Sequence, residues 1–582
     1  MTRDDDVRVR LGRVRDRGRG SGRRAKPFIA QALTAAEKAG GIHRRSSGRS
    51  ARSGAFGRGR CASVAASRFM SDRTRHVTVK ARVIRHRSRA APLRTHLAYL
   101  RRDGVTRDGA AGRMFDADYD NVDHRDFAER CEGDRHHFRF IVSPEDAEQL
   151  SDLKSFTREL MAQAQCDLGT GLDWIGVDHW NTDNPHVHVI VRGKADDGRD
   201  LVIARDYIRQ GMRARAAHLA TLELGPRTDR ELHRDLEVQI DADRWTRLDR
   251  VLAHEAAQNG GFIDLRPDAG ATANNLFRSA MVGRMQKLER LSLAEPLGPA
   301  RWHLSEDAEP LLRALGQRGD IIKRIHRGLA EQRIERSVVD FAFDNKGTAT
   351  SLIGRLVARG LDDELKGTAY AVIDGLDGRA HHLRLGNLDA ATDASPGSIV
   401  ELRRFDDAAG RQRVALAVRS DLPIGAQVHA DGATWLDRQL VAREPASLSS
   451  GGFGREVRDA MHARTEHLIG KNLAKRQNQR VIFACDLLET LRRQELAAES
   501  ARIAGNTGTP YHPTSEGESV AGTYRRRLDL ASGRFAMIDD GLGFSLVPWS
   551  PSLEQRLGRH VSGIARIGRI EWSFGRAHGP SI

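Results

Sequence analysis

The segment "LDWIGVDHWNTDNPHVHVIVR", residues 172–192, constrains the fold of this chain more than any other stretch. Residues 172–180 and 186–192 each read as a β-strand, because apolar side chains recur there with a period of two. The connection at 181–185 is polar and short, so the two strands are expected to be antiparallel neighbours. The sequence therefore predicts a β-hairpin.

Three histidines stand on this predicted hairpin. Side chains alternate between the two faces of a strand, so His186 and His188 share one face with Ile190 and Arg192, while the intervening valines fill the other face. His179 ends the preceding strand, across the turn from His186. Three imidazole rings are thus predicted to converge above one face of the sheet.

Neutral imidazoles on rigid strands bind divalent metal ions, and three protein ligands leave coordination positions open for water or substrate. The spacing H-x6-H-x-H favours a catalytic metal site over the alternative of three polar residues on a sheet surface. A structural zinc site would need a fourth ligand, and no cysteine lies nearby. The cysteines are scattered without paired spacing, as expected of a chain from a reducing compartment: Cys61, Cys131, Cys166 and Cys485.

Tyr99 is a second candidate residue. It lies in "PLRTHLAYLRRDG", where leucines recur at helical spacing and an Asp-Gly pair supplies a stop, so a short helix is predicted. A phenol ionises only at a pKa near ~10, but neighbouring arginines, a metal or a base would favour the phenolate as a nucleophile. On spacing alone, the alternative of an aromatic residue packed in the core stays open.

Together the two segments resemble the motifs of relaxases of conjugative and mobilisable elements, in the class that includes the border-nicking enzyme of T-DNA transfer. The resemblance rests on "HLAYLRRDGVTRDG" followed by "HWNTDNPHVHVIVRG", and it covers about residues 71–230. It implies an α+β fold, an antiparallel sheet with flanking helices of the HUH nuclease type. It makes Tyr99 the nucleophile, and His179, His186 and His188 the ligands of a divalent metal, Mg²⁺ or Mn²⁺.

The activity that this resemblance implies is site- and strand-specific nicking of a transfer origin. The enzyme would stay on the 5′ end as a phosphotyrosyl adduct and pilot the strand in conjugative transfer. Its implied partners are single-stranded or locally melted DNA, the coupling protein of a type IV secretion system and accessory DNA-binding proteins. The alternatives are a rolling-circle replication initiator, which uses the same chemistry, and a non-catalytic DNA-binding scaffold of the transfer complex.

Other residues near the two motifs are candidates for supporting roles. The candidates for phosphate or DNA binding are Arg192, Arg101 and Arg102, with a surface salt bridge as the alternative for Arg192. The family pattern often has an aspartate two residues after the first histidine, where this chain has Asn181. The candidates for orienting a histidine or accepting the tyrosine proton are Asp178, Asp183 and Asp103, with turn or surface roles as the alternative.

Charge is concentrated at the start of the chain. Residues 1–70 hold 18 Lys/Arg and 5 Asp/Glu, a balance of +13 out of the total of +16. This Arg/Gly-rich arm is too poor in apolar residues to fold alone and is expected to be disordered, either binding nucleic-acid phosphates or keeping the chain in solution. No apolar run approaches the ~18 residues that cross a bilayer, so a cytoplasmic bacterial protein without membrane insertion is expected, with export alongside the transferred strand as an alternative.

Four regions are predicted to follow the arm. They are a relaxase domain at 71–230, a helical region at 231–345, a small β-rich domain at 346–445, and a helical segment with an Arg-rich, β-containing tail at 446–582. In the first region, strands are expected at 76–86 and 137–142, and Ser143 is expected to cap a helix that ends near Gly169. No internal repeat of fixed period is apparent.

Overall fold

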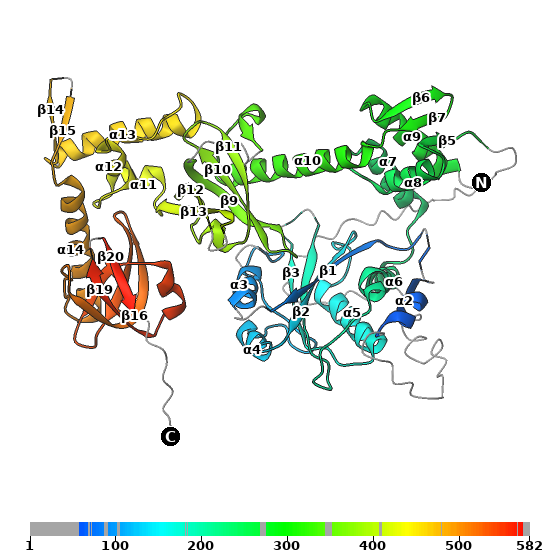
Figure 1. The fold of residues 1–582 in the computed structure, drawn as a ribbon, viewed down its shortest axis with the longest axis horizontal. Helices are drawn as coiled ribbons and strands as arrows, with labels where there is room; N and C mark the ends of the chain where they lie inside the picture. Colours follow the sequence, from blue (N-terminus) through cyan, green and yellow to red (C-terminus); the bar gives the residue numbers. More distant parts are fainter. Residues whose placement is uncertain are drawn as a thin grey trace, which may run out of the picture. The chain divides into compact units, whose positions relative to one another are not determined.

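The computed structural model of this chain describes residues 58–67, 70–71, 73–86, 91–101, 105–180, 182, 184–267, 275–343, 352–406, 410–478, 480–566 and 568–573. These residues form two compact units, Met1–Val238 and Gln239–Ile582, each described by itself below. Both units combine helices with predominantly antiparallel sheets, which confirms the mixed α+β class (Figure 1). Within the described residues, every helix is too short or too polar to cross a membrane.

The first unit is built on a four-stranded sheet. Its strands are β1 (Val77–Arg85), β2 (His136–Pro144), β3 (Trp174–His179) and β4 (His186–Arg192), in the order β1-β2-β4-β3 with every pair antiparallel. The predicted hairpin is confirmed as β3 and β4, and His179 lies directly opposite His186. The strands predicted at 76–86 and 137–142 are confirmed as β1 and β2.

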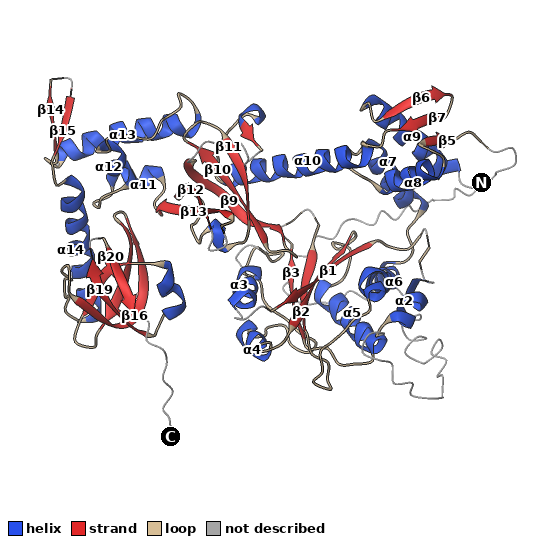
Figure 2. Ribbon diagram, viewed as in Figure 1, coloured by secondary structure: helices blue, strands red, loops and turns tan. Residues whose placement is uncertain are grey.

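Helices cover both faces of this sheet (Figure 2). On one face lie α3 (Ala91–Leu100) and α4 (His124–Arg130), and their apolar side chains form a core with Ile175, Val177 and Ile190. On the other face lie α5 (Leu153–Leu168) and α6 (Met212–Leu224), packed against the three valines of β4. The hairpin is therefore held between two apolar cores, as its alternating sequence requires.

The start of α5 differs from the prediction. The helix begins at Leu153, where the Asp152 side chain accepts hydrogen bonds from the backbone N–H groups of Lys154 and Ser155. Ser143 is not its cap, because β2 runs on through Pro144, which pairs with Val77. The predicted end is confirmed, since Gly169 closes the helix in the left-handed conformation with φ 63°.

The arm is also shorter than predicted. Residues 1–57 lie outside the described residues. Residues 60–67, expected to be disordered, instead form the helix α2 (Arg60–Ser67), in which Ala66 is buried and the Ser63 hydroxyl donates to the Asp206 carbonyl over 3.1 Å. The small apolar residues of "CASVAAS" bury one helical face, which an isolated arm could not do.

The second unit contains the same succession of elements twice. The first copy consists of α7 (Asp229–Asp241), which crosses the boundary between the units, α8 (Arg247–Gln258), α9 (Asn275–Arg290), the hairpin β6 (Ala294–Gly298) and β7 (Arg301–Leu304), and α10 (Ala308–Glu331). The second copy consists of α11 (Ile424–His429), α12 (Trp435–Leu440), α13 (Gly452–Gly470), the hairpin β14 (Ala474–Gln477) and β15 (Arg480–Phe483), and α14 (Leu487–Thr507). The first copy adds β5 (Phe262–Asp264) beside β7.

A five-stranded antiparallel sheet closes each copy. The first comprises β9 (Ile353–Asp363), β10 (Thr368–Gly375), β11 (Ala380–Leu385), β12 (Ile399–Asp406) and β13 (Gln412–Ser420). The second comprises β16 (Ser519–Leu530), β17 (Gly533–Asp539), β18 (Phe544–Pro548), β19 (His560–Arg566) and β20 (Arg569–Ser573). Both have the same spatial order, β13-β12-β9-β10-β11 and β20-β19-β16-β17-β18, and the first adds the short β8 (Phe341–Ala342).

A buried arginine anchors each copy in the same way. Arg284 of α9 donates to both carboxylate oxygens of Asp249, over 2.8 and 2.9 Å, and to the carbonyls of residues 240, 242 and 244. Arg464 of α13 donates to both oxygens of Asp437, each over 2.8 Å, and to the carbonyls of residues 428, 430 and 432. All four side chains are at most 1% exposed.

The sequence predicted no repeat of fixed period, and the duplication that the structure shows has no fixed period either, because corresponding elements of the two copies lie at different spacings. The two copies share few residues, so self-similarity is weak along the chain. A short signal existed: Thr246 and Thr434 each open a T-x-L-D-R stretch, and in both the threonine and the aspartate form a capping box.

Candidate metal centre

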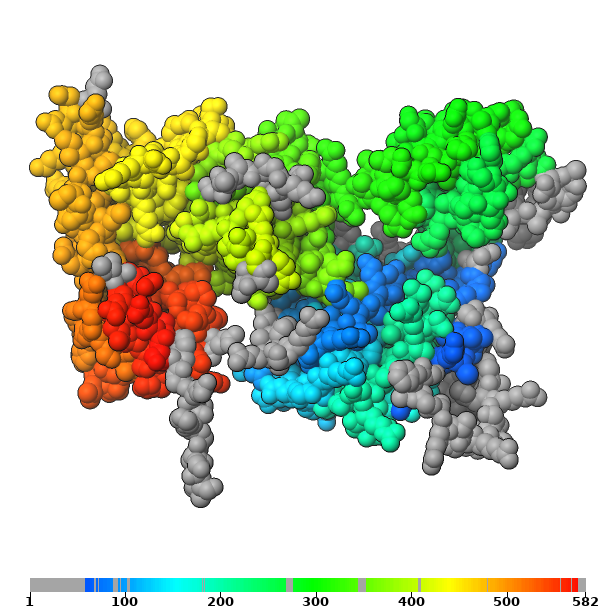
Figure 3. All heavy atoms as spheres, viewed as in Figure 1, coloured from blue at the N-terminus to red at the C-terminus, as the bar shows by residue number. Residues whose placement is uncertain are grey.

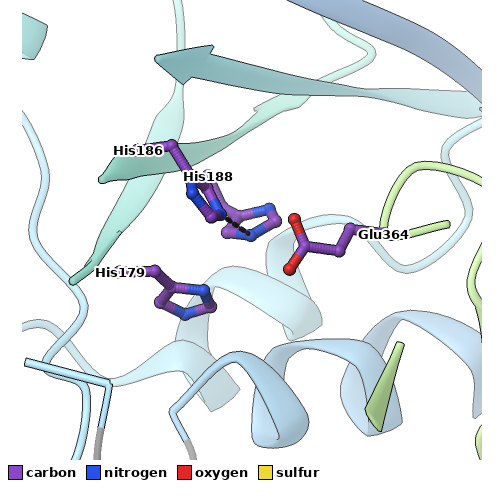
Figure 4. A group of neighbouring side chains, drawn as sticks. All are labelled: His179, His186, His188 and Glu364. Carbon is purple, nitrogen blue, oxygen red and sulfur yellow. Dashed lines mark hydrogen bonds between the residues drawn. The ribbon is translucent and has the colours of Figure 1, made fainter. Parts of the chain in front are cut away.

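The rings of His179, His186 and His188 face one another on one side of the sheet (Figure 4). All three residues are at most 6% exposed, and one ligand atom from each lies within 4.8 Å of the others. Their ring centroids are 4.6 to 5.4 Å apart. This group can hold a metal ion. Figure 4 also draws Glu364, which belongs to the second unit, and the centre described here consists of the three histidines of the first unit.

The backbone orients two of these rings. His186 Nδ1 lies 2.9 Å from the Asn184 carbonyl, and His179 Nε2 lies 2.9 Å from the Leu100 carbonyl. A carbonyl only accepts, so each of these nitrogens carries its proton and the other ring nitrogen keeps its lone pair. In His186 that second nitrogen is Nε2, which lies 3.2 Å from His188 Nε2. Metal-binding histidines are commonly fixed by such outer hydrogen bonds.

The bond from His179 to Leu100 connects the histidines to the helix that carries Tyr99. Leu100 ends α3 and is fully buried, while Tyr99, the residue before it, is partly exposed. Three leucines of α3 pack on Val177 and Ile190, in the strands that carry the histidines. The sequence placed Tyr99 and the histidines in separate motifs, and the fold brings these two segments of backbone together.

Arg192 makes the salt bridge that the sequence left open as an alternative. Its Nε donates to Asp134 over 2.8 Å and its Nη2 over 3.3 Å. The Asp134 side chain is 4% exposed, and the Arg192 side chain is 28% exposed. A phosphate would have to compete with this carboxylate, so a phosphate-binding role for Arg192 stays a prediction.

The other supporting candidates lie apart from the rings or outside the described residues. Asp178 alternates onto the opposite face from His179, where it accepts from Trp180 Nε1 over 2.7 Å. Arg101 follows α3 and its Nη1 lies 2.9 Å from His124 Nδ1. The candidates that fall outside the described residues are Arg102, Asp103 and Asp183. The structure thus brings neither Asp178 nor Arg101 into the group of histidines.

Cations that the sequence analysis did not single out share the face of the histidines. His188 of β4 pairs with Ile141 of β2, which pairs with Lys80 of β1. Two residues away on the same face, Arg139 of β2 pairs with Arg82 of β1. Lys80 and Arg82 are exposed on the edge strand β1, and in the part of the chain that the structure describes no carboxylate forms an ion pair with either of them or with Arg139. Their period-two spacing in "VTVKARVIR" was the available signal.

Arg139 and His137 form a buried polar pair on this face. Arg139 Nε donates to His137 Nε2 over 3.0 Å. Burial lowers the pKa of His137 to about 2, with a smaller contribution from the Arg139 charge, so His137 is neutral near pH 7. Burial and the neighbouring Arg82 lower the pKa of Arg139 to about 10, and this guanidinium therefore stays charged. The face next to the histidines consequently carries three cationic side chains, Lys80, Arg82 and Arg139.

Comparison with known proteins finds a family match for most of the second unit, and this match does not include the histidines. The family described as "Protein of unknown function (DUF3363)" matches residues 281–410 and 402–581. The three histidines and Tyr99 lie before this range. No curated protein and no solved structure matches the chain.

Proposed function

The chain belongs to the family described as protein of unknown function DUF3363, and because that description assigns no activity, we propose a function from the histidine site of the first unit. We infer that the protein is a metal-dependent DNA relaxase, which nicks and rejoins one strand at a transfer origin. The observation that carries this proposal is the convergence of three buried imidazoles, one of them bonded to the backbone of the helix that carries Tyr99.

His179, His186 and His188 would hold the ion, because their donor set is three imidazoles, two of them oriented by backbone carbonyls. A divalent cation bound there, Mg²⁺ or Mn²⁺ by resemblance, supplies electrophilic polarisation of a phosphate oxygen. The backbone carbonyls of Leu100 and Asn184 would fix which ring nitrogens face the ion. The metal site is thereby positioned before any DNA arrives, which is how preorganised groups stabilise a transition state.

Tyr99 is proposed as the nucleophile. Its phenol oxygen forms a bond to phosphorus while the bond from phosphorus to the 3′ oxygen breaks. The phenol proton leaves and a proton is taken up by the departing 3′ oxygen, which becomes a free hydroxyl. The ester energy is kept in the phosphotyrosyl link, so attack by a 3′ hydroxyl reverses the step without a nucleotide cofactor. Asp103 and Asp183 stay candidates for accepting the tyrosine proton.

The cationic face supports a path for the DNA strand. Lys80 and Arg82 are exposed on β1, the edge of the sheet, and Arg139 lies between them and the histidines in the register of the strands. Phosphate contacts of this kind position a nucleic acid without reading its sequence. The strand would run across β1 and β2 toward the metal centre. The proposed partners of the complex are a coupling protein and accessory DNA-binding proteins.

The test is adduct formation by Tyr99→Phe. The variant should form no covalent adduct with a labelled single-stranded oligonucleotide of the element's own transfer origin in the presence of Mn²⁺, because only the attacking oxygen is lost. Its affinity for the same oligonucleotide should stay within a few fold of the parent, measured by fluorescence anisotropy. Tyr119→Phe, at an exposed tyrosine of the same unit, is the matched control and should retain the adduct.

Undiminished adduct in Tyr99→Phe would assign the nucleophile to another residue. Absence of any adduct in the parent protein, with Mn²⁺ or Mg²⁺, would count against relaxase activity as a whole.

A further inference from the structure

The hairpin β14–β15 of the second copy carries a cation, Lys475, at a position where its counterpart in the first copy has none, beside Arg480, which corresponds to Arg301 of the first copy. The paired residues Lys475 and Ile482, and Gln477 and Arg480, share one face of this hairpin, and all four are exposed. The opposite face turns Ala474 inward, with Val481 and Phe483 packed against the same core. The outward face is thus a cationic surface free of carboxylates.

The first copy offers a comparison within one molecule. Its hairpin β6–β7 follows α9 as β14–β15 follows α13, and each is entered through a residue with positive φ, 58° at Ser292 and 60° at Asn472. Lys475 lies three residues after Asn472, and the residue three positions after Ser292 in the first copy is Glu295. The fold therefore forms without a cation at this position. Its presence in the second copy needs a reason other than folding.

The edges of the two hairpins also differ. In the first copy β5 pairs with β7, so that β7 lies inside a three-stranded sheet. In the second copy the hairpin is a sheet of two strands, and it extends beyond the helices that precede and follow it (Figures 1 and 3). A two-stranded antiparallel ribbon fits the major groove of duplex DNA, which is about 12 Å wide.

We propose that the hairpin β14–β15 binds the phosphates of duplex DNA through Lys475 and Arg480. In the described residues neither side chain is ion-paired with a carboxylate, whereas Arg476, on the other face, pairs with Glu466. Gln477 lies between the two cations and can donate to a phosphate or to a base edge. The occupant is duplex rather than single-stranded DNA, because the exposed face has no aromatic ring on which unpaired bases would stack.

This site is independent of the proposed nuclease centre and lies in the region that the family match covers. It would allow the second unit to bind double-stranded DNA whether or not the first unit cleaves a DNA strand. Adduct formation on single-stranded DNA should accordingly be unchanged when the hairpin is altered, so failure of one proposal is distinguishable from failure of the other.

The experiment compares Lys475→Gln/Arg480→Gln with a matched double variant of the first copy, Arg290→Gln/Arg301→Gln, in the full chain. Both remove two exposed cations near corresponding hairpins. Binding to a short duplex of mixed sequence is measured across a range of salt concentrations. The hairpin variant should lower the steepness of log K against log salt by about 1.8, from two phosphates at about 0.9 each, and the matched variant should leave it unchanged.

A charge-retaining variant, Lys475→Arg/Arg480→Lys, should keep the parent slope, which separates loss of charge from loss of folding. An unchanged slope in the hairpin variant would overturn the proposal. So would an equal decrease in both double variants, which indicates a general effect of net charge. A decrease as large with single-stranded DNA as with the duplex would overturn the assignment to duplex DNA.

Discussion

At the scale of single residues, the candidate metal centre depends on which ring nitrogen carries a proton. The Asn184 carbonyl selects the tautomer of His186, and the Leu100 carbonyl selects that of His179. Neither contact depends on another side chain, so both orientations are set once the hairpin and α3 are folded. Two of the three candidate ligands are thus restrained by the backbone itself.

His186→Ala should remove metal binding, because a trio of ligands becomes a pair. The loss of Mn²⁺ affinity by calorimetry should exceed the about 10- to 100-fold that follows loss of an outer hydrogen-bond partner. His137→Ala is the matched control, since His137 is buried on the same face of the neighbouring β2 but lies outside the trio. Equal affinity losses in the two variants would mean that burial, not ligation, explains the effect.

The sequence was informative about the residues whose role follows from alternation. His179, His186 and His188 were predicted to share a face because the strand period is two, and the register of β3 and β4 confirms it. Lys80, Arg82 and Arg139 were missed because they lie on β1 and β2, and the order of strands in a sheet cannot be read from period alone. Tyr99 stays a prediction, carried by its motif and by its neighbour Leu100.

At the scale of elements, a buried arginine joins a helix to the turn before another helix in each copy. Arg464 satisfies three carbonyls as well as Asp437, and Arg284 does the same for its own copy. A buried charge without its partner is costly, and so are buried carbonyls without a donor. Each arginine is therefore expected to determine the stability of its own copy.

Arg464→Met should destabilise the second copy by about 3–5 kcal/mol, because it leaves the Asp437 carboxylate buried without its counter-charge. Hydrogen exchange followed by mass spectrometry should show faster exchange in residues 424–470 and unchanged exchange in residues 240–290. Arg284→Met should give the reverse pattern. Arg458→Met, at an exposed arginine of α13, is the control and should change neither segment.

If both arginine variants accelerated exchange in both segments, the copies would be one cooperative unit rather than two.

Element boundaries were predicted least well from sequence. Ser143 has a good capping side chain, but the pairing of Pro144 with Val77 keeps that segment extended. The helix therefore begins only at Leu153, with Asp152 as its N-cap. Local preference lost to tertiary pairing there, whereas Gly169 ended the helix as predicted because its φ of 63° favours glycine.

At the scale of the whole molecule, most of the net charge precedes the first described helix. Residues 1–57 hold 15 Lys/Arg and 5 Asp/Glu, so much of the total of +16 lies there. The helix α2 follows and is packed on the first unit, which makes residue 57 rather than 70 the position at which to truncate. A truncation at 70 would remove part of the core.

Deleting residues 1–57 should weaken binding to nonspecific DNA and flatten its salt dependence, because each lost phosphate contact reduces the slope of log K against log salt by about 0.9 on duplex DNA. The measurement is a salt titration of affinity for parent and truncated chains. A variant in which the arginines of this segment become lysines keeps the charge and should keep the slope. An identical slope after deletion would show that the segment does not touch phosphates.

The doubled architecture has a consequence for how the chain reaches its native state. The two sheets have the same connectivity and follow each other in one polypeptide, so each strand could form a non-native pair with a strand of the other copy. Tandem units of this kind are prone to exchange elements during folding. We expect the sequence differences between the copies to favour the native pairing of β16 with β17 over a pairing with β10, the corresponding strand of the first copy. Raising the resemblance of the two halves by consensus design should therefore lower the yield of correctly assembled protein.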